Sequence, residues 1–290
     1  MINKKMKGIL FSFISSFLYA LNVLVLKYFM KDISSNELLF LLYTGSTIGI
    51  LLIILFNKQK ISFVPKREEI SFIFGTIICD ILATLLITES LKFLNASIVS
   101  LLSVLEIAAT IIISYIIFRN KINRNLIFSV IFVTFGGIIL SINSALKVDF
   151  SMASILVILA SFLWGLKNNL TAKMSNKNPL LLVFYTCFAV SIFNLLYIIK
   201  DSNIFMLIFN HWYLLIIGFF TYGLSILYFA YGTKFLGASK TAIIFSLSPI
   251  FSTILSIIIF NEKSNILFII SLILMIIGIR FTIYDNKKNN

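Results

Sequence analysis

KFLNAS at residues 92–97 and SYIIFRNKIN at residues 114–123 recur later in the chain as KFLGAS at residues 234–239 and SIIIFNEKSN at residues 256–265. The spacing between the two segments is the same in both copies, and no gap is needed to align them. Chance matches of apolar residues are common in so hydrophobic a chain, but the alignment of Lys92 with Lys234 and of Gly136 with Gly278 is not of that kind. The chain therefore contains a duplication, which favours an architecture built from two repeats.

The composition indicates a membrane protein. Hydrophobic residues make up 60% of the 290 residues and charged residues only 12%, about half the charged fraction of a soluble domain. The net charge of +13 does not indicate a nucleic-acid partner, because the Lys and Arg residues lie in short segments between apolar runs, where they set topology. The bilayer is therefore the expected surroundings.

Ten apolar runs have about the 20 residues that a helix needs to cross the hydrocarbon core. They are continuously apolar, without the alternation of barrel strands, so we expect helices throughout. The predicted fold is an all-α polytopic membrane protein with ten transmembrane helices. The predicted spans are 8–30, 37–56, 69–91, 95–118, 124–143, 152–173, 180–199, 210–232, 238–260 and 264–284.

The distribution of basic residues predicts the orientation. Lys and Arg concentrate at the N-terminus, near the C-terminus and in every second connection, which places both termini in the cytoplasm. Five spans per repeat then bring the second repeat into the membrane upside down. We therefore predict two inverted five-helix repeats, at residues 1–146 and 147–290, with a substrate site between them near the middle of the membrane.

The repeats also share their first helix, which reads SFLYA at residues 16–20 and SFLWG at residues 161–165. Together with KFLGAS, FNEK at residues 260–263 and the glycine of the last span, this order of motifs resembles the EamA-type members of the drug/metabolite transporter superfamily. The resemblance implies a carrier of amino acids, nucleobases, vitamins, quaternary amines or drugs in a bacterial cytoplasmic membrane. It also implies a cavity lined by the first, third and fourth helices of each repeat. The Glu-Pro pair usual in the fourth helix is divided here between Glu106 and Pro249.

Three charged residues inside predicted spans are candidates for the substrate site: Asp80, Glu106 and Lys167. A charge in the membrane costs about 2.5–3.5 kcal/mol on insertion scales, so each invites a functional interpretation. The alternatives are a hydrogen bond to a packed Ser or Thr for Asp80, and extension of Lys167 to the cytoplasmic interface.

Six uncharged residues complete the predicted substrate site. They lie on helices that the resemblance places around the cavity, and the repeat aligns Tyr222 with Asp80 and Ser248 with Glu106. The set is Tyr19, Asn22, Trp164, Tyr222, Ser225 and Ser248. The alternative for the aromatic residues is helix packing.

The sequence offers no catalytic or metal-binding pattern. His211 is the single histidine, and neither Cys79 nor Cys187 has metal-ligand spacing. We therefore expect no cofactor and no enzymatic activity. A membrane-embedded enzyme acting on lipids is the alternative class, but it would need clustered carboxylates or a His with a nucleophile.

The predicted function is secondary active transport by alternating access. Two acids and one base favour an amino acid, a related zwitterion or an organic cation as the substrate, with export as the expected direction and protons as a candidate coupling ion. The alternative within the same class is facilitated uptake or exchange of a vitamin, a nucleobase or a quaternary amine. We expect a monomer or a weak homodimer.

Overall fold

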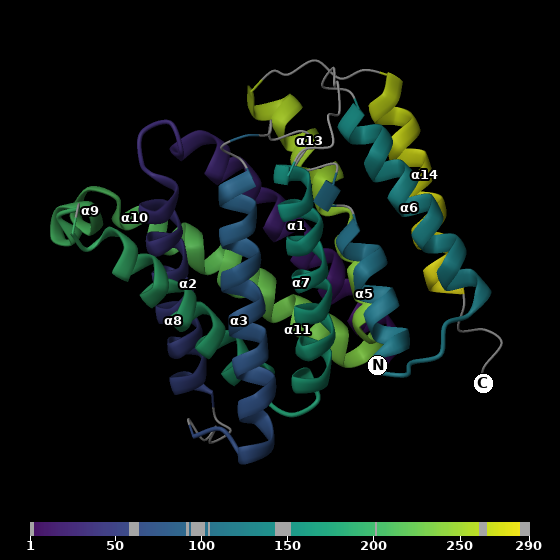
Figure 1. The fold of residues 1–290 in the computed structure, drawn as a ribbon, viewed down its shortest axis with the longest axis horizontal. Helices are drawn as coiled ribbons and strands as arrows, with labels where there is room; N and C mark the ends of the chain where they lie inside the picture. Colours follow the sequence, from purple (N-terminus) through teal and green to yellow (C-terminus); the bar gives the residue numbers. More distant parts are fainter. Residues whose placement is uncertain are drawn as a thin grey trace. The chain divides into compact units, whose positions relative to one another are not determined.

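A computed structural model describes residues 3–57, 64–90, 93, 102–103, 105–142, 152–200, 202–260 and 266–284. Within these ranges every regular element is helical (Figure 1). The elements are α1 (Lys4–Phe29), α2 (Ser35–Phe56), α3 (Arg67–Ser90), α5 (Leu105–Ile116), α6 (Arg124–Ile142), α7 (Met152–Ser175), α8 (Pro179–Ile198), α9 (Ile204–Asn210), α10 (Trp212–Gly218), η1 (Phe219–Leu224), α11 (Ser225–Leu236), α12 (Ala238–Phe245), α13 (Ser248–Phe260) and α14 (Ile266–Tyr284).

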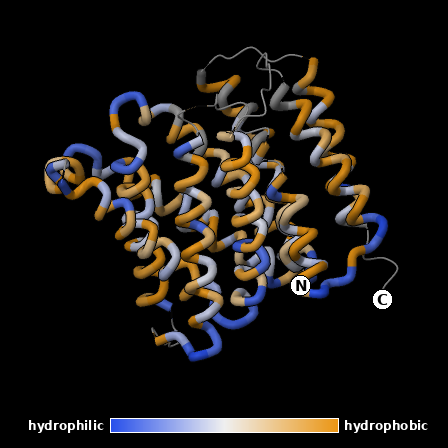
Figure 2. Tube along the Cα trace, in the orientation of Figure 1, coloured by the Kyte–Doolittle hydropathy of each residue, from blue (hydrophilic) through white to orange (hydrophobic). Residues whose placement is uncertain are grey.

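The helices confirm an all-α polytopic membrane protein. In the described part of the chain, seven helical stretches are long and apolar enough to cross a membrane, and three shorter helices are also apolar. Figure 2 shows hydrophobic residues along the helices and hydrophilic ones at many of their ends and connections. The long stretches are Lys4–Leu26, Ser35–Phe56, Arg67–Ile87, Met152–Ser175, Pro179–Ile198, Trp212–Leu236 and Ala238–Ile259. The total of ten spans stays a prediction, since part of the predicted 95–118 span lies outside the described residues.

Two of the predicted spans depart from a single regular α-helix. The 210–232 span consists of α10, the π-helical segment η1 and α11, preceded by the short helix α9. The 238–260 span is divided into α12 and α13 by a turn at Ser246 and Leu247. Pro249 explains the second division, because it has no N–H to donate to the carbonyl of Phe245 one turn earlier.

The chain forms two compact units that differ from the sequence repeats. Residues 1–78 and 170–235 form unit 1, and residues 79–169 and 236–290 form unit 2. Helices α3 and α7 therefore contribute residues to both units. The repeat boundaries at 1–146 and 147–290 stay a prediction.

Unit 1 is built around α2, which packs along α8 and against α10 and η1. Gly45 and Gly218 make the contact of α2 with α10 close. A Cβ added at Gly45 would overlap the carbonyl group of Leu215, and one at Gly218 would overlap the backbone of Leu42. Only residues without a side chain allow this approach, as is usual for helix packing in membranes.

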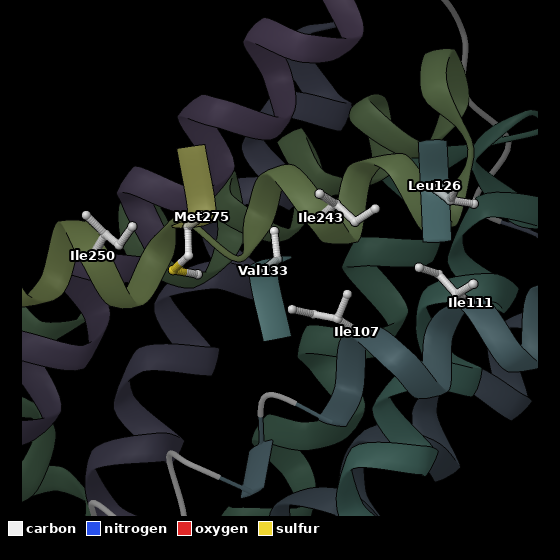
Figure 3. Close-up of a cluster of buried hydrophobic side chains, with 7 residues drawn as sticks. All are labelled: Ile107, Ile111, Leu126, Val133, Ile243, Ile250 and Met275. Atoms are coloured by element: carbon white, nitrogen blue, oxygen red, sulfur yellow. The ribbon is translucent and has the colours of Figure 1, made fainter. Parts of the chain in front are cut away.

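Unit 2 contains the helix pair α6 and α14, which lie side by side along their length (Figure 1). The Ser271 hydroxyl donates a hydrogen bond to the Gly136 carbonyl oxygen, and the Thr282 hydroxyl donates one to Ser129. A cluster of buried apolar side chains joins this pair to α5, α12 and α13 (Figure 3). Its members are Ile107, Ile111, Leu126, Val133, Ile243, Ile250 and Met275. The cluster gives α5 a fixed position, and α5 carries one of the candidate acids.

Candidate functional site

Helix α7 presents three polar side chains, Trp164, Lys167 and Asn168, to α3 and α5 in unit 2. Their spacing of three and four residues puts them on one helical face. Gly165 brings this part of α7 close to α5, because a Cβ added there would lie 2.8 Å from the Thr110 backbone nitrogen. The small residue therefore determines how near the polar face of α7 comes to α5.

Asp80 of α3 forms a buried ion pair with Lys167. The Lys167 ammonium nitrogen lies 2.7 Å from Asp80 Oδ1, and the Trp164 indole N–H donates to the same oxygen at 3.3 Å. The side chain of Asp80 is 3% exposed and that of Lys167 is 16% exposed. Asp80 Oδ2 is buried and has no hydrogen-bond partner among the described residues. Lys167 thus turns inward to the acid, and among the described residues Asp80 is paired with a cation and not with a Ser or Thr hydroxyl.

Glu106 lies in the first turn of α5 and has a different partner. The Asn168 side-chain amide donates to Glu106 Oε1 at 2.8 Å and to the Thr110 hydroxyl oxygen at 3.1 Å. The Thr110 hydroxyl in turn donates to the Glu106 carbonyl oxygen. Within the described ranges Glu106 has no cation within ion-pair distance. The polar face of α7 therefore contacts one acid that is paired with a cation and one acid that is held by an amide.

The adjacent Asn169 fixes α7 to α5 from inside unit 2. Its side-chain amide donates to the Thr110 carbonyl oxygen at 2.8 Å and to the Gly165 carbonyl oxygen at 2.9 Å. Asn169 is 2% exposed. These bonds position the neighbouring Lys167 and Asn168. No group of three His, Cys, Asp or Glu side chains suited to a metal occurs in the part of the chain that the structure describes.

A second polar and aromatic cluster lies in unit 1. The Tyr19 ring of α1 meets the Tyr222 ring of η1 edge-on, with centroids 6.5 Å apart, and the Tyr43 ring lies 4.5 Å from Tyr222. The Thr221 hydroxyl donates to Asn22 Oδ1 at 3.4 Å. The Asn22 amide nitrogen is buried without a hydrogen-bond partner in the described residues. Tyr222 also lies in the π-helical segment η1, and π-helical turns are frequent at functional sites.

Several residues of the two clusters align in the predicted sequence repeats. The alignment of SFLYA with SFLWG matches Tyr19 with Trp164 and Asn22 with Lys167, and the later alignment matches Tyr222 with Asp80. The contact of Trp164 with Asp80 therefore corresponds to that of Tyr19 with Tyr222. Lys167 and Asn22 differ in their partners, since Lys167 bonds Asp80 and Asn22 bonds Thr221, the residue before Tyr222. The unit 2 cluster is charged, whereas its unit 1 equivalent is neutral and aromatic.

The two predicted serines lie apart from these contacts. Ser225 and Ser15 each donate a hydroxyl hydrogen bond to the other's carbonyl oxygen, at 3.0 Å and 2.8 Å, which joins α11 to α1. Ser248 is buried and is the first residue of α13, directly after the turn that follows α12. A role in substrate binding stays a prediction for these two serines and for the other seven residues of the predicted site.

Four residues of the two clusters are missing from the predicted substrate site: Thr110, Asn169, Thr221 and Tyr43. Thr110 follows Glu106 by one helical turn, and Asn169 is one of two consecutive asparagines in an apolar run. Both signals are visible in the sequence. Tyr43 carries no such signal, because its contact with Tyr222 depends on how α2 packs against η1.

An apolar helical protein with polar groups buried inside its membrane helices has the features of a membrane transport protein. A sequence model of the EamA-like transporter family matches residues 6–142 and again residues 151–284. The chain belongs to this family, which is part of the drug/metabolite transporter superfamily.

Two further proteins resemble this chain, one in sequence and one in fold. An uncharacterized transporter of Methanothermobacter thermautotrophicus is 26% identical over 231 residues, which cover 78% of this chain and 67% of that protein. A crystal structure described only as that of a protein superposes with a TM-score of 0.78 at 12% identity. The superposition covers 94% of this chain and 95% of the other chain, and it supports the fold alone. The chain is therefore a multi-pass membrane transporter.

Proposed function

We propose that the protein is a secondary active transporter that moves an amino acid or a related zwitterion across a bacterial cytoplasmic membrane by alternating access. The observation that carries the proposal is the buried pair of Asp80 and Lys167, with Nζ and Oδ1 2.7 Å apart. A buried ion pair contributes little net stability, because desolvation offsets the attraction. Its presence inside a transporter therefore favours a functional role.

A zwitterion is the substrate class that this pair suits best. Its ammonium group would take the place of Lys167 at Asp80, and its carboxylate would take the place of Asp80 at Lys167. No charge is then left unpaired in the apolar interior, where an unpaired charge is costly. Asp80 Oδ2 has no partner in the described part of the chain and supplies an acceptor for this exchange.

Glu106 is the residue that we assign to the coupling ion. Its carboxyl group is held by Asn168 without a cation in ion-pair distance within the described ranges. Uptake of a proton would neutralise this acid while leaving the pair of Asp80 and Lys167 intact. Transport of a zwitterion driven by protons follows from this division of roles.

Proteoliposomes test the proposal. We expect counterflow of a labelled amino acid by the wild type and a loss of at least about tenfold, equal to 1.4 kcal/mol, in Asp80→Asn and Lys167→Gln. Glu106→Gln should keep counterflow but lose uptake driven by a pH gradient. Undiminished transport in the Asp80 and Lys167 variants would remove them from the substrate site.

The chain supplies a matched control. Glu68 of α3 forms an ion pair with Lys177, two residues after the end of α7, at the same 2.7 Å separation. These side chains are 78% and 33% exposed. Exposed pairs contribute about 0–1 kcal/mol. Glu68→Gln and Lys177→Gln should therefore transport like the wild type, and an equal loss in these variants would show a general effect of charge.

A further inference from the structure

An apolar groove lies on the surface of unit 2 between α5 and α6. It has a volume of about 430 Å³ and is lined by apolar and aromatic side chains, which is within the size range of ligand pockets, roughly 300–1,000 Å³. Its lining includes Ala108, Ile112 and Tyr115 of α5, Ile122 of the connection, and Ile127 and Ile131 of α6. Ile112, Tyr115, Ile127 and Ile131 are each more than 40% exposed, so the groove is open to its surroundings.

Three basic residues lie in the connection between α5 and α6 and at the start of α6, next to Ile122 in the chain. Arg119, Lys121 and Arg124 are exposed, and the described residues provide no ion pair to any of them. Ile122, which lines the groove, lies between Lys121 and Arg124 in the chain. Residues 107–142 contain no Asp or Glu. The chain segment that lines the groove therefore carries basic residues and no acid.

The connection is held in place by its own hydrogen bonds. The backbone N–H of Asn120 donates to the Ser114 carbonyl oxygen at 3.0 Å, and its side-chain amide donates to the Ser114 hydroxyl oxygen at 2.7 Å. Asn123 accepts a hydrogen bond from the backbone N–H of Leu126 and caps α6. Arg119 adopts φ 51°, a helix-terminating conformation in which Gly is usual and any other side chain is disfavoured. The backbone that carries the three basic residues is thus held in place.

We propose that this groove binds an anionic phospholipid, with one acyl chain along α5 and α6 and the headgroup phosphate on Arg119, Lys121 and Arg124. Apolar walls that end in a basic cluster match a lipid with a hydrocarbon chain and a negative headgroup. A second copy of the chain fits less well, because it would add three more cations to a face where residues 107–142 supply no acid. The positive-inside distribution puts this lipid in the cytoplasmic leaflet. The proposal does not depend on the substrate or on the coupling ion.

Native mass spectrometry of the purified full chain in detergent tests this site. Phosphatidylglycerol and phosphatidylcholine with the same acyl chains are the two probes. We expect one phosphatidylglycerol molecule to bind tightly and phosphatidylcholine to bind much more weakly. The triple variant Arg119→Gln, Lys121→Gln, Arg124→Gln should bind phosphatidylglycerol on the order of 100-fold more weakly, since each cation near the surface contributes about 1 kcal/mol.

The matched control removes the same charge elsewhere, with Lys4→Gln, Lys5→Gln and Lys7→Gln at the start of α1. It should bind like the wild type. Ile112→Trp fills the groove at an exposed position and keeps the cations, and it should also reduce phosphatidylglycerol binding. This variant replaces the triple variant as the test if the triple variant does not fold. Equal binding of both lipids, an equal loss in the control, full binding by Ile112→Trp, or a lipid-free dimer that covers the groove would overturn the proposal.

Discussion

Replacing Lys167 by Met tests the pair of Asp80 and Lys167 most directly. The change removes the ammonium group and leaves the Asp80 carboxylate with the Trp164 indole N–H at 3.3 Å. Because the Asp80 side chain is 3% exposed, its charge stays buried without a cation. Removal of one partner of a buried pair costs about 3–5 kcal/mol, so we expect the free energy of unfolding to fall by that amount.

The complementary change should cost less. Asp80→Asn leaves the Lys167 ammonium unpaired, but this side chain is 16% exposed and reaches more solvent on a flexible stem. We expect a loss on the order of 1–3 kcal/mol, the cost of one unsatisfied polar group. The double variant Asp80→Leu, Lys167→Met removes both charges and should recover most of the stability, because apolar replacement of a buried pair is often neutral.

The two cysteines provide the assay. Cys79 and Cys187 are both buried, so a fluorogenic maleimide reacts with them only on unfolding. A Cys79→Ala background leaves Cys187 of α8 as the reporter, away from the changed residues in sequence. Equal losses in the two single variants, or a double variant no more stable than Lys167→Met, would refute the assignment of a buried, desolvated pair. A stable double variant that still transports would refute the role of the pair in transport.

Three further changes test the packing and the remaining polar contacts. Gly45→Ala should lower the free energy of unfolding by about 1–3 kcal/mol through overpacking, whereas Gly223→Ala, where the nearest atom to an added Cβ is at 3.3 Å, should cost clearly less in the same denaturant titration. Asn168→Ala should lower the free energy of unfolding by about 1–3 kcal/mol, because it leaves the Glu106 carboxyl group without its donor. Asn194 donates to a carbonyl oxygen of its own helix, so Asn194→Ala should cost less. Equal losses would contradict the interhelical role of Asn168. Pro249→Ala restores a backbone N–H and should slow hydrogen exchange in residues 246–248 as a continuous helix forms, and unchanged exchange would show that proline is not the cause of the turn.

The lengths of the apolar runs predicted the helical elements well because lipid requires backbone groups to be paired within each segment. The turn before Ser248 also has a visible cause, since Pro249 is in the sequence. The π-helical segment at Phe219–Leu224 has none. FFTYGL contains no proline, and its geometry depends on packing against α1, α2 and α10.

The candidate site was predictable as a set of residues but not as a set of contacts. Asp80, Glu106 and Lys167 are conspicuous because charges are rare in apolar spans. Their partners are not, because the duplication aligns the two copies without stating which helices touch. The pairing of Asp80 with Lys167, 87 residues apart, and of Glu106 with Asn168 comes from the packing of α7 against α3 and α5.

The π-helical segment η1 makes the stretch from α10 to α11 more tolerant of a one-residue deletion than a regular helix is. A π-helix holds more residues per turn than an α-helix, so loss of one residue within Phe219–Leu224 converts the segment toward regular α-helix and spares the turns beyond it. In α3, which is regular from Arg67 to Ser90, the same loss rotates every later side chain by about 100°. Single-residue deletions should therefore accumulate among relatives in the segment around Tyr222 and be absent from the turns around Asp80.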